Sequence, residues 1–146
     1  MTLSKVDLDS SVGYELKRVQ HALRLAMDSE VRALGLTTPQ YAALSVLERG
    51  EELFGAELAR RCFVTPQTMS GILSGLESAK LIERHAHPTH GRIVQAHLTQ
   101  SGAELLAQAH ERVTAVEERM VSGLSGEERK GLLSALKRCT VALEAG

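Results

Sequence analysis

The spacing of apolar residues changes twice along this chain of 146 residues, and that change constrains the fold most. Up to about Leu76, apolar residues recur every three or four positions, as in amphipathic helices. Residues 81–84 and 92–98 are instead short β-prone runs around a loop that contains proline and glycine. Helical spacing returns from Ala103. The order predicts a mainly α-helical fold with one β-hairpin.

Capping signals divide the helical parts into six helices. Thr38 and Thr65 each precede a proline, as an N-cap residue does when proline takes the first helical position. Ser125 and Glu128 form a capping box, and Gly35 ends the first helix. The expected helices run from 12 to about 34, from 39 to about 49, over 55–62, from 66, from 103 to about 124, and from 126.

Composition fits one globular domain over residues 1–146. Hydrophobic residues make up 43% and charged residues 24%, which excludes intrinsic disorder. No apolar run reaches the roughly 18 residues of a membrane span, and the start of the chain has no apolar core of signal-peptide length. These features predict a cytoplasmic protein without contact to a membrane.

The middle of the chain has the pattern of a winged helix-turn-helix. Two short helices are joined by a tight turn, and the hairpin follows them directly. The outward face of the second of these helices is small and polar: Gln67, Thr68, Ser70, Gly71 and Ser74. Such a face can enter the major groove, where Gln reads adenine and Thr or Ser reads bases or phosphates. The backbone N–H groups after Thr65 suit a phosphate, although a solvated surface would have the same composition.

The hairpin is the expected wing, and the charge distribution agrees. Residues 54–100 carry a formal charge of +2 and the remainder −3. We expect Arg92, near the hairpin tip, to enter the minor groove. Arg84, at the base, is expected to meet a phosphate or to pair with Glu77 or Glu83.

Histidines and cysteines leave three sensor alternatives open on the same fold. His87 and His90 are expected to meet DNA phosphates, but together with His85 they could hold a metal ion or respond to pH. Cys62 lies at an apolar position and is expected to pack in the core. Cys139, in the last helix, is expected to pack as well, with a role between subunits as the alternative. A reactive thiol at either position is the third alternative.

The order and spacing of several motifs resemble one family. The chain carries Thr37-x-Pro39-Gln40-Tyr41, Glu57-Leu58-Ala59-Arg60-Arg61, Val64-Thr65-Pro66-Gln67-Thr68-Met69-Ser70, Leu76-Glu77-x-x-x-Leu81-Ile82-Glu83-Arg84, Pro88-x-x-x-Arg92 and Leu98-Thr99-x-x-Gly102. As a set these resemble the MarR family of transcriptional regulators over nearly the whole chain. The resemblance implies a homodimeric repressor whose affinity for DNA a small ligand tunes. It also implies a DNA-binding lobe over 36–100 and dimerisation through 1–35 and 101–146.

Three departures from the family pattern fall in the DNA-binding part. His90 and Gly91 stand where the family usually has an acidic residue and a base, so Arg92 lacks its customary acidic partner. Gly71 and Gly75 stand where the family commonly has arginine, which predicts fewer phosphate contacts. Lys80 replaces the glycine that usually ends the helix.

One face of the first helix is a candidate ligand site. Tyr14, Arg18 and His21 are spaced by four and three residues, so they share a face that could hold an aromatic carboxylate or a similar anion. The resemblance places the pocket where the first, second and fifth helices meet the DNA-binding lobe. The competing interpretation is a solvated face with an ion pair to Glu15.

The sequence predicts no enzyme activity. It contains no nucleophile elbow, P-loop, GxGxxG or HExxH motif, and no cysteine pair with zinc-site spacing. We therefore expect no cofactor and no bound metal. The expected partners are double-stranded DNA with a palindromic operator, a second copy of the chain, and a small-molecule effector.

Overall fold

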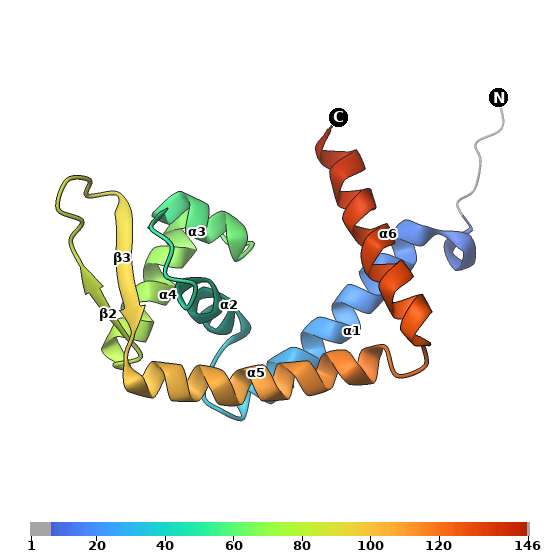
Figure 1. Ribbon diagram of the computed structural model, residues 1–146, viewed down its shortest axis with the longest axis horizontal. Helices are drawn as coiled ribbons and strands as arrows, with labels where there is room; N and C mark the ends of the chain where they lie inside the picture. Colours follow the sequence, from blue (N-terminus) through green and yellow to red (C-terminus); the bar gives the residue numbers. More distant parts are fainter. Residues whose placement is uncertain (1–6, 146) are drawn as a thin grey trace.

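The computed structural model describes residues 7–145 and confirms six helices with a small β-sheet (Figure 1). The elements are η1 (Leu8–Ser10), α1 (Val12–Arg32), α2 (Thr38–Leu47), β1 (Leu53–Phe54), α3 (Gly55–Arg61), α4 (Pro66–Ser78), β2 (Ile82–His85), β3 (Ile93–Leu98), α5 (Gln100–Met120) and α6 (Gly126–Glu144).

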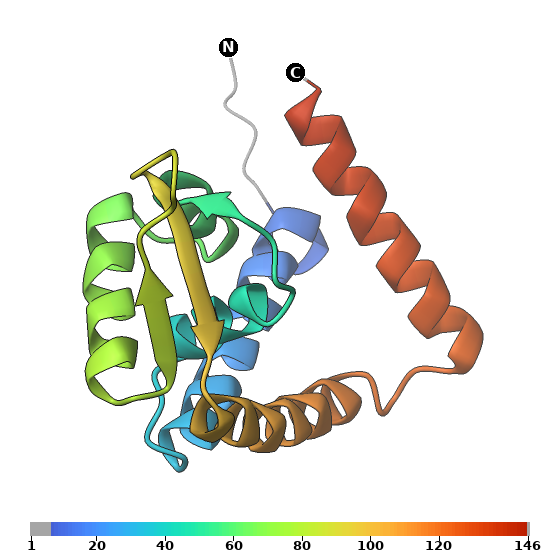
Figure 2. The ribbon, with the colours of Figure 1, turned by 60° about the vertical axis from the view of Figure 1, so that its left-hand side comes forward.

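The hairpin belongs to a three-stranded antiparallel sheet. Strands β2 and β3 form the hairpin, with Ile82 opposite Leu98. The connector before α3 supplies the short β1, in which Leu53 pairs with Val94, so the strand order is β1-β3-β2. Because β1 leads straight into α3, the sheet ties the hairpin to the start of the helix-turn-helix (Figure 2).

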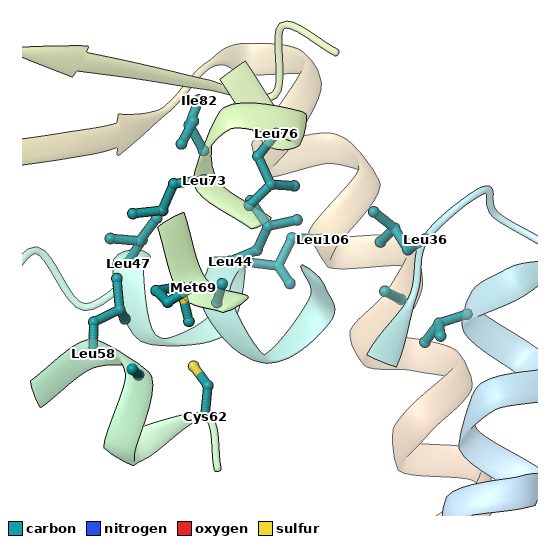
Figure 3. Packing of buried hydrophobic residues seen from close by; sticks show 14 of the residues in the cluster. Leu36, Leu44, Leu47, Leu58, Cys62, Met69, Leu73, Leu76, Ile82 and Leu106 are labelled. Carbon is teal, nitrogen blue, oxygen red and sulfur yellow. The ribbon is translucent and has the colours of Figure 1, made fainter. Parts of the chain in front are cut away.

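An aliphatic core holds α4 against its neighbours. Figure 3 shows side chains from α2, α3, α4, β2 and α5 converging between the helices and the hairpin. The largest fully buried side chains of these elements are Leu44, Leu58, Met69, Leu76, Ile82 and Leu106. A chain with so few aromatic residues packs its helices through leucine, alanine and valine. This core fixes which side of α4 remains exposed.

The terminal helices are less well covered. Helix α1 packs along α5, but no residue of α6 is buried, and α6 extends away from the lobe (Figures 1 and 2). A cavity of about 510 Å³ separates its first turns from the start of α1 and the end of α5. The apolar side chains exposed in this region include Leu16, Val19, Met120, Leu132, Leu133, Leu136, Val141 and Leu143. None of the helices described in residues 7–145 is both long enough and apolar enough to cross a membrane.

The start of α2 corrects the expected cap. The N-cap is Thr37, whose hydroxyl accepts the Gln40 N–H at 3.2 Å, while Gln40 Oε1 accepts the Thr37 N–H at 3.0 Å. This reciprocal capping box gives two hydrogen bonds, whereas Thr38 as the N-cap would give at most one. Proline therefore stands one position further into the helix than expected.

The bounds of two long helices also differ from expectation. Helix α5 begins at Gln100 rather than Ala103, because Thr99 caps it by accepting the Gly102 N–H at 3.0 Å. The same helix ends at Met120, before a turn that leads to the Ser125 cap of α6. Helix α1 ends at Arg32, and Gly35 follows in the turn with φ +82°.

Candidate nucleic-acid interface

Helix α4 is positioned by its apolar side. Met69, Leu73 and Leu76 are buried against α2 and α3, which directs the opposite side of the helix to solvent. The six predicted residues of this part are all exposed: Thr65, Gln67, Thr68, Ser70, Gly71 and Ser74. The structure thus brings these residues onto one polar face, which we call the α4 face.

The N-cap of α4 leaves polar groups available at the surface. Thr65 Oγ1 accepts the Thr68 N–H at 3.1 Å and donates to the Thr68 hydroxyl at 2.9 Å. The Thr68 hydroxyl proton is therefore free to bind another acceptor. Pro66 has no N–H, and the Gln67 N–H has no acceptor among residues 7–145. These groups suit the acceptor oxygens of a phosphate or a base edge.

Arg84 of β2 is held by an acidic residue of α4. Its Nη2 and Nε donate to Glu77 Oε1 at 3.0 and 3.3 Å. The hydrogen bond and positive charge of Arg84 hold the pKa of Glu77 below its ordinary value. Both side chains are substantially exposed, so the pair contributes little to stability. Of the two carboxylates expected to pair with Arg84, Glu77 does so. Glu83 pairs instead with His97, with 3.1 Å between Oε2 and Nε2.

Arg92 lies in the turn just before β3, and its guanidinium has no partner among residues 7–145. Its carbonyl accepts the Gly55 N–H at 3.3 Å, which anchors its backbone to α3. Its exposed side chain has no hydrogen bond or ion pair with any described residue. A cavity of about 580 Å³ lies between α4 and the hairpin, and its lining includes the apolar Met69 and Leu73 and the cationic Arg84 and Arg92.

His87 corrects one predicted contact. Its side chain is only 13% exposed. Nδ1 accepts the N–H groups of Thr89 at 3.2 Å and His90 at 2.9 Å, and Nε2 lies 3.5 Å from Glu52. The ring therefore stabilises the hairpin loop, because Nδ1 is the acceptor for the N–H groups of Thr89 and His90. This arrangement does not leave His87 turned outward toward a phosphate.

The structure does not bring His85, His87 and His90 together as a metal site. His85 stacks on His97 with ring centroids 5.0 Å apart, and the exposed His90 packs its ring edge-on against Phe54 at 5.0 Å. The three rings diverge because the first lies in β2, whereas the other two lie in a turn that bends back toward β1.

The candidate ligand face on α1 lies away from the DNA-binding lobe. Arg18 donates to Glu15 at 2.8 Å, and Tyr14 and His21 are exposed. His21 stands ten residues before the buried Val31, roughly 15 Å along the helix, and the side of α1 that lines the cavity toward α6 is instead that of Val12, Leu16 and Val19. The resemblance pointed to a pocket next to the lobe, and these three residues are not there within one chain.

The two cysteines have different surroundings. Cys62 is buried, as expected, and burial raises the pKa of its thiol, which lowers its reactivity. Cys139 on α6 is exposed, which corrects the expectation that it packs within the chain.

Comparison with known proteins agrees with this arrangement. Residues 34–93 match the MarR family. The HTH-type transcriptional repressor Rv2887 of Mycobacterium tuberculosis is 35% identical over 130 residues, which cover 89% of this chain and 94% of that repressor.

Solved structures extend the likeness. The crystal structure of Rv2887 with salicylic acid is 34% identical, covers 90% of this chain and 97% of that one, and superposes with a TM-score of 0.73. A structure of the same protein with DNA is 31% identical with the same TM-score and covers 90% and 98% of the two chains. The repressor CouR, bound to a 23-mer DNA duplex, is 27% identical with a TM-score of 0.81 and coverage of 96% and 99%.

Proposed function

Because the chain belongs to the MarR family, we propose that it is a sequence-specific DNA-binding transcriptional regulator that represses from a palindromic operator as a homodimer. The observation that carries the proposal is the exposed α4 face beside the unpaired Arg92 of the wing. Residues 36–100 then form the DNA-binding lobe, and 1–35 with 101–146 form the dimerisation region. DNA as the partner would place the protein in the cytoplasm.

The α4 face is suited to reading bases because it combines small side chains with an amide that can both donate and accept a hydrogen bond. Gln67 can pair with adenine through its amide, and Thr68 has a hydroxyl proton to donate. Ser70 and Ser74 are short enough to let the helix approach the floor of the groove. Gly71 has no atom within 4 Å of the position of a Cβ, so the helix is open to solvent there.

The two arginines have different roles in this proposal. Arg92 is free to enter the minor groove, where its charge favours narrow A·T-rich steps. Arg84 already pairs with Glu77, so a phosphate contact from Arg84 must compete with that carboxylate. Loss of Arg92 therefore weakens DNA binding more than loss of Arg84.

A homodimer is supported by the uncovered apolar surface of the terminal helices. Helix α6 buries none of its residues within the chain, although Leu132, Leu133 and Leu136 are apolar and exposed. A second copy related by a two-fold axis would cover this surface and present two α4 faces. The operator would then be a palindrome with half-sites about 34–36 Å apart, one turn of DNA.

The proposed effector is an aromatic acid. Rv2887, a relative, has been crystallised with salicylic acid and with p-aminosalicylic acid. Arg18 offers this chain one cationic site, with Tyr14 and His21 beside it. The cavity between α4 and the hairpin offers another, since both apolar residues and the cationic Arg84 and Arg92 line it. An anion in that second cavity would compete directly with DNA for Arg92.

Selection of bound duplexes from a random library tests the DNA-binding proposal. We expect a palindromic consensus. Gln67→Ala and Thr68→Ala should relax the preference at defined positions by about 1–3 kcal/mol each, whereas Arg92→Ala should weaken all duplexes, those with A·T-rich flanks most. Equal losses for every variant on every duplex would contradict the assignment of base-reading residues.

A thermal-shift series with salicylate and related acids, measured without DNA, tests the effector. If the ligand lies on α1, Arg18→Ala abolishes the shift and Arg92→Ala keeps it. If the ligand lies beside α4, the pattern reverses. A shift that survives both substitutions would exclude both sites.

A further inference from the structure

One carboxylate and two imidazoles gather on the outer face of the wing. The strand register pairs Glu83 with His97 and His85 with Gln95. Directly paired residues of antiparallel strands point to the same face, and so do residues two apart on one strand. Glu83, His85 and His97 therefore share a face, and one oxygen or nitrogen ligand atom from each lies within 4.8 Å of the others.

The other two residues of β2, Ile82 and Arg84, point to the opposite face and do not belong to this group. Ile82 is buried in the core and Arg84 turns to Glu77. Within the described part of the chain, the ion pair recorded for Glu83 is with His97, at 3.1 Å between Oε2 and Nε2. The rings of His85 and His97 are stacked with an interplanar angle of 21°. A carboxylate thus faces two imidazoles, while Arg84, which stands between Glu83 and His85 in β2, is paired with Glu77.

We propose that Glu83, His85 and His97 bind a divalent transition-metal ion of the zinc class. Two nitrogen donors and one carboxylate oxygen suit Zn²⁺ or Co²⁺, whereas Mg²⁺ and Ca²⁺ prefer oxygen ligands throughout. A tetrahedral zinc ion with bonds of about 2.0–2.1 Å needs ligand atoms roughly 3.3 Å apart. The three ligand atoms now lie within 4.8 Å of one another. All three side chains are exposed, so small rotations about their own bonds can bring these atoms to the shorter separation that the ion needs.

Such an ion would join the two strands of the wing. Glu83 and His85 belong to β2 and His97 to β3, so the coordination bonds cross between the two paired strands of the hairpin. With three protein ligands, the fourth position is left to water. Because the ion binds the folded hairpin and not the unfolded chain, the melting temperature of the protein should rise with the metal concentration. This site is separate from the α4 face and does not depend on DNA binding.

Zinc titration of the tag-free, chelator-treated protein against a competing indicator dye tests the proposal. The matched control is His110→Gln, since His110 also lies near a carboxylate, 3.1 Å from Glu48, but has no second imidazole in its group. We expect one ion per chain for wild type and for this control. Each of Glu83→Gln, His85→Gln and His97→Gln should weaken binding by about tenfold or more.

Two further measurements make the result decisive. Co²⁺ bound to wild type should give the intense visible absorption of four- or five-coordinate cobalt, and His97→Gln should lose it. Circular dichroism should show equal helix content in all variants, because none of the three side chains is in the core. Wild type without saturable zinc binding, or ligand variants that bind as the control does, would overturn the proposal. DNA binding is measured separately, so its failure would leave the metal result intact.

Discussion

At the scale of single residues, two helix ends use a backbone conformation that favours glycine. Lys80 after α4 has φ +61° and Phe63 after α3 has φ +57°. For side-chain-bearing residues this left-handed region costs about 1–2 kcal/mol. Lys80 also stands where the resemblance led us to expect glycine, and the turn that glycine would make is present without it. The chain retains the turn because Leu81 N–H still bonds the Leu76 carbonyl at 3.0 Å.

Replacing Lys80 by glycine should therefore stabilise the protein. We expect Lys80→Gly to raise the free energy of unfolding by about 1 kcal/mol, measured by urea denaturation. Lys80→Ala removes the same charge and keeps the strain, so it should give no such gain. A gain of equal size in Lys80→Ala would show that removing the charge, not relieving the backbone, is responsible.

Gly102 illustrates the reverse case. A Cβ at this position would lie 2.0 Å from the Leu81 carbonyl oxygen, so the backbone itself occupies the space. This close approach explains a glycine two positions inside α5, where it otherwise weakens a helix. It also lets Thr99 accept the Gly102 N–H while donating to the Lys80 carbonyl at 2.7 Å.

Gly102→Ala should destabilise the protein because α5 must move away from β2. We expect the free energy of unfolding to fall by about 2 kcal/mol or more. Gly71→Ala in α4 is the matched control, since nothing lies within 4 Å of its Cβ position, and it should gain about 0.5–1 kcal/mol from helix propensity. Losses in both variants would contradict the close approach as the cause.

At the scale of elements, the start of α6 couples stability to pH. Glu128 Oε1 accepts the Ser125 N–H at 2.9 Å, and Ser125 Oγ accepts the Glu128 N–H at 3.1 Å. The hydrogen bonds from the backbone and the side chain of Ser125 lower the pKa of Glu128 from its ordinary value of 4.5. A carboxylate with a depressed pKa in the folded state contributes stability above its unfolded pKa and loses it as pH falls through the folded pKa.

Acidification below about pH 4.5 should thus weaken α6 in wild type. Glu128→Gln keeps an acceptor oxygen but does not titrate, so the part of the pH dependence below 4.5 that is due to this residue should be absent. Melting temperatures of both proteins between pH 3 and pH 7, with helix content followed by circular dichroism, measure the difference. Parallel curves for the two proteins would exclude Glu128 as the titrating group.

Local signals account for most of the elements that sequence reasoning found. Proline after threonine, the change of hydrophobic period and the Ser125–Glu128 pair each act within a few residues, and each indicated an element that is present. The errors at α2 and α5 came from two threonines competing to be the cap and from reading Thr99 as the end of the hairpin. Such errors move a boundary without changing the fold.

Contacts between distant residues were harder to predict. His87 lies 35 positions from Glu52, and the sequence carries no local signal that the sheet brings them together. The stacking of His85 on His97 depends on a register that the wing loop determines. The grouping of three histidines by proximity in sequence therefore failed, whereas the α4 face, which follows from helical period alone, is present.

At the scale of the whole molecule, the chain leaves its helical ends incompletely packed. Within residues 7–145 the core is formed by the lobe together with residues of α1 and α5, whereas no residue of α6 is buried, and α6 borders an apolar cavity with α1 and α5. An exposed apolar surface of this kind on a folded chain indicates a protein partner. A two-fold partner is the simplest, because each α6 then covers the matching surface of the other copy.

Charging this surface should separate the two copies. Sedimentation at micromolar concentration should give about twice 15.8 kDa for wild type and a mass near 15.8 kDa for the double variant Leu133→Glu/Leu136→Glu, since burying two carboxylates in an apolar interface is costly. Phe63→Glu is the control, because Phe63 is 94% exposed in the turn before α4, and it should remain dimeric. The monomeric variant should also lose its preference for two half-sites over one, since a single α4 face reads only one. A stable wild-type monomer, or a double variant that sediments as a dimer, would mean that α6 is not the dimerisation surface.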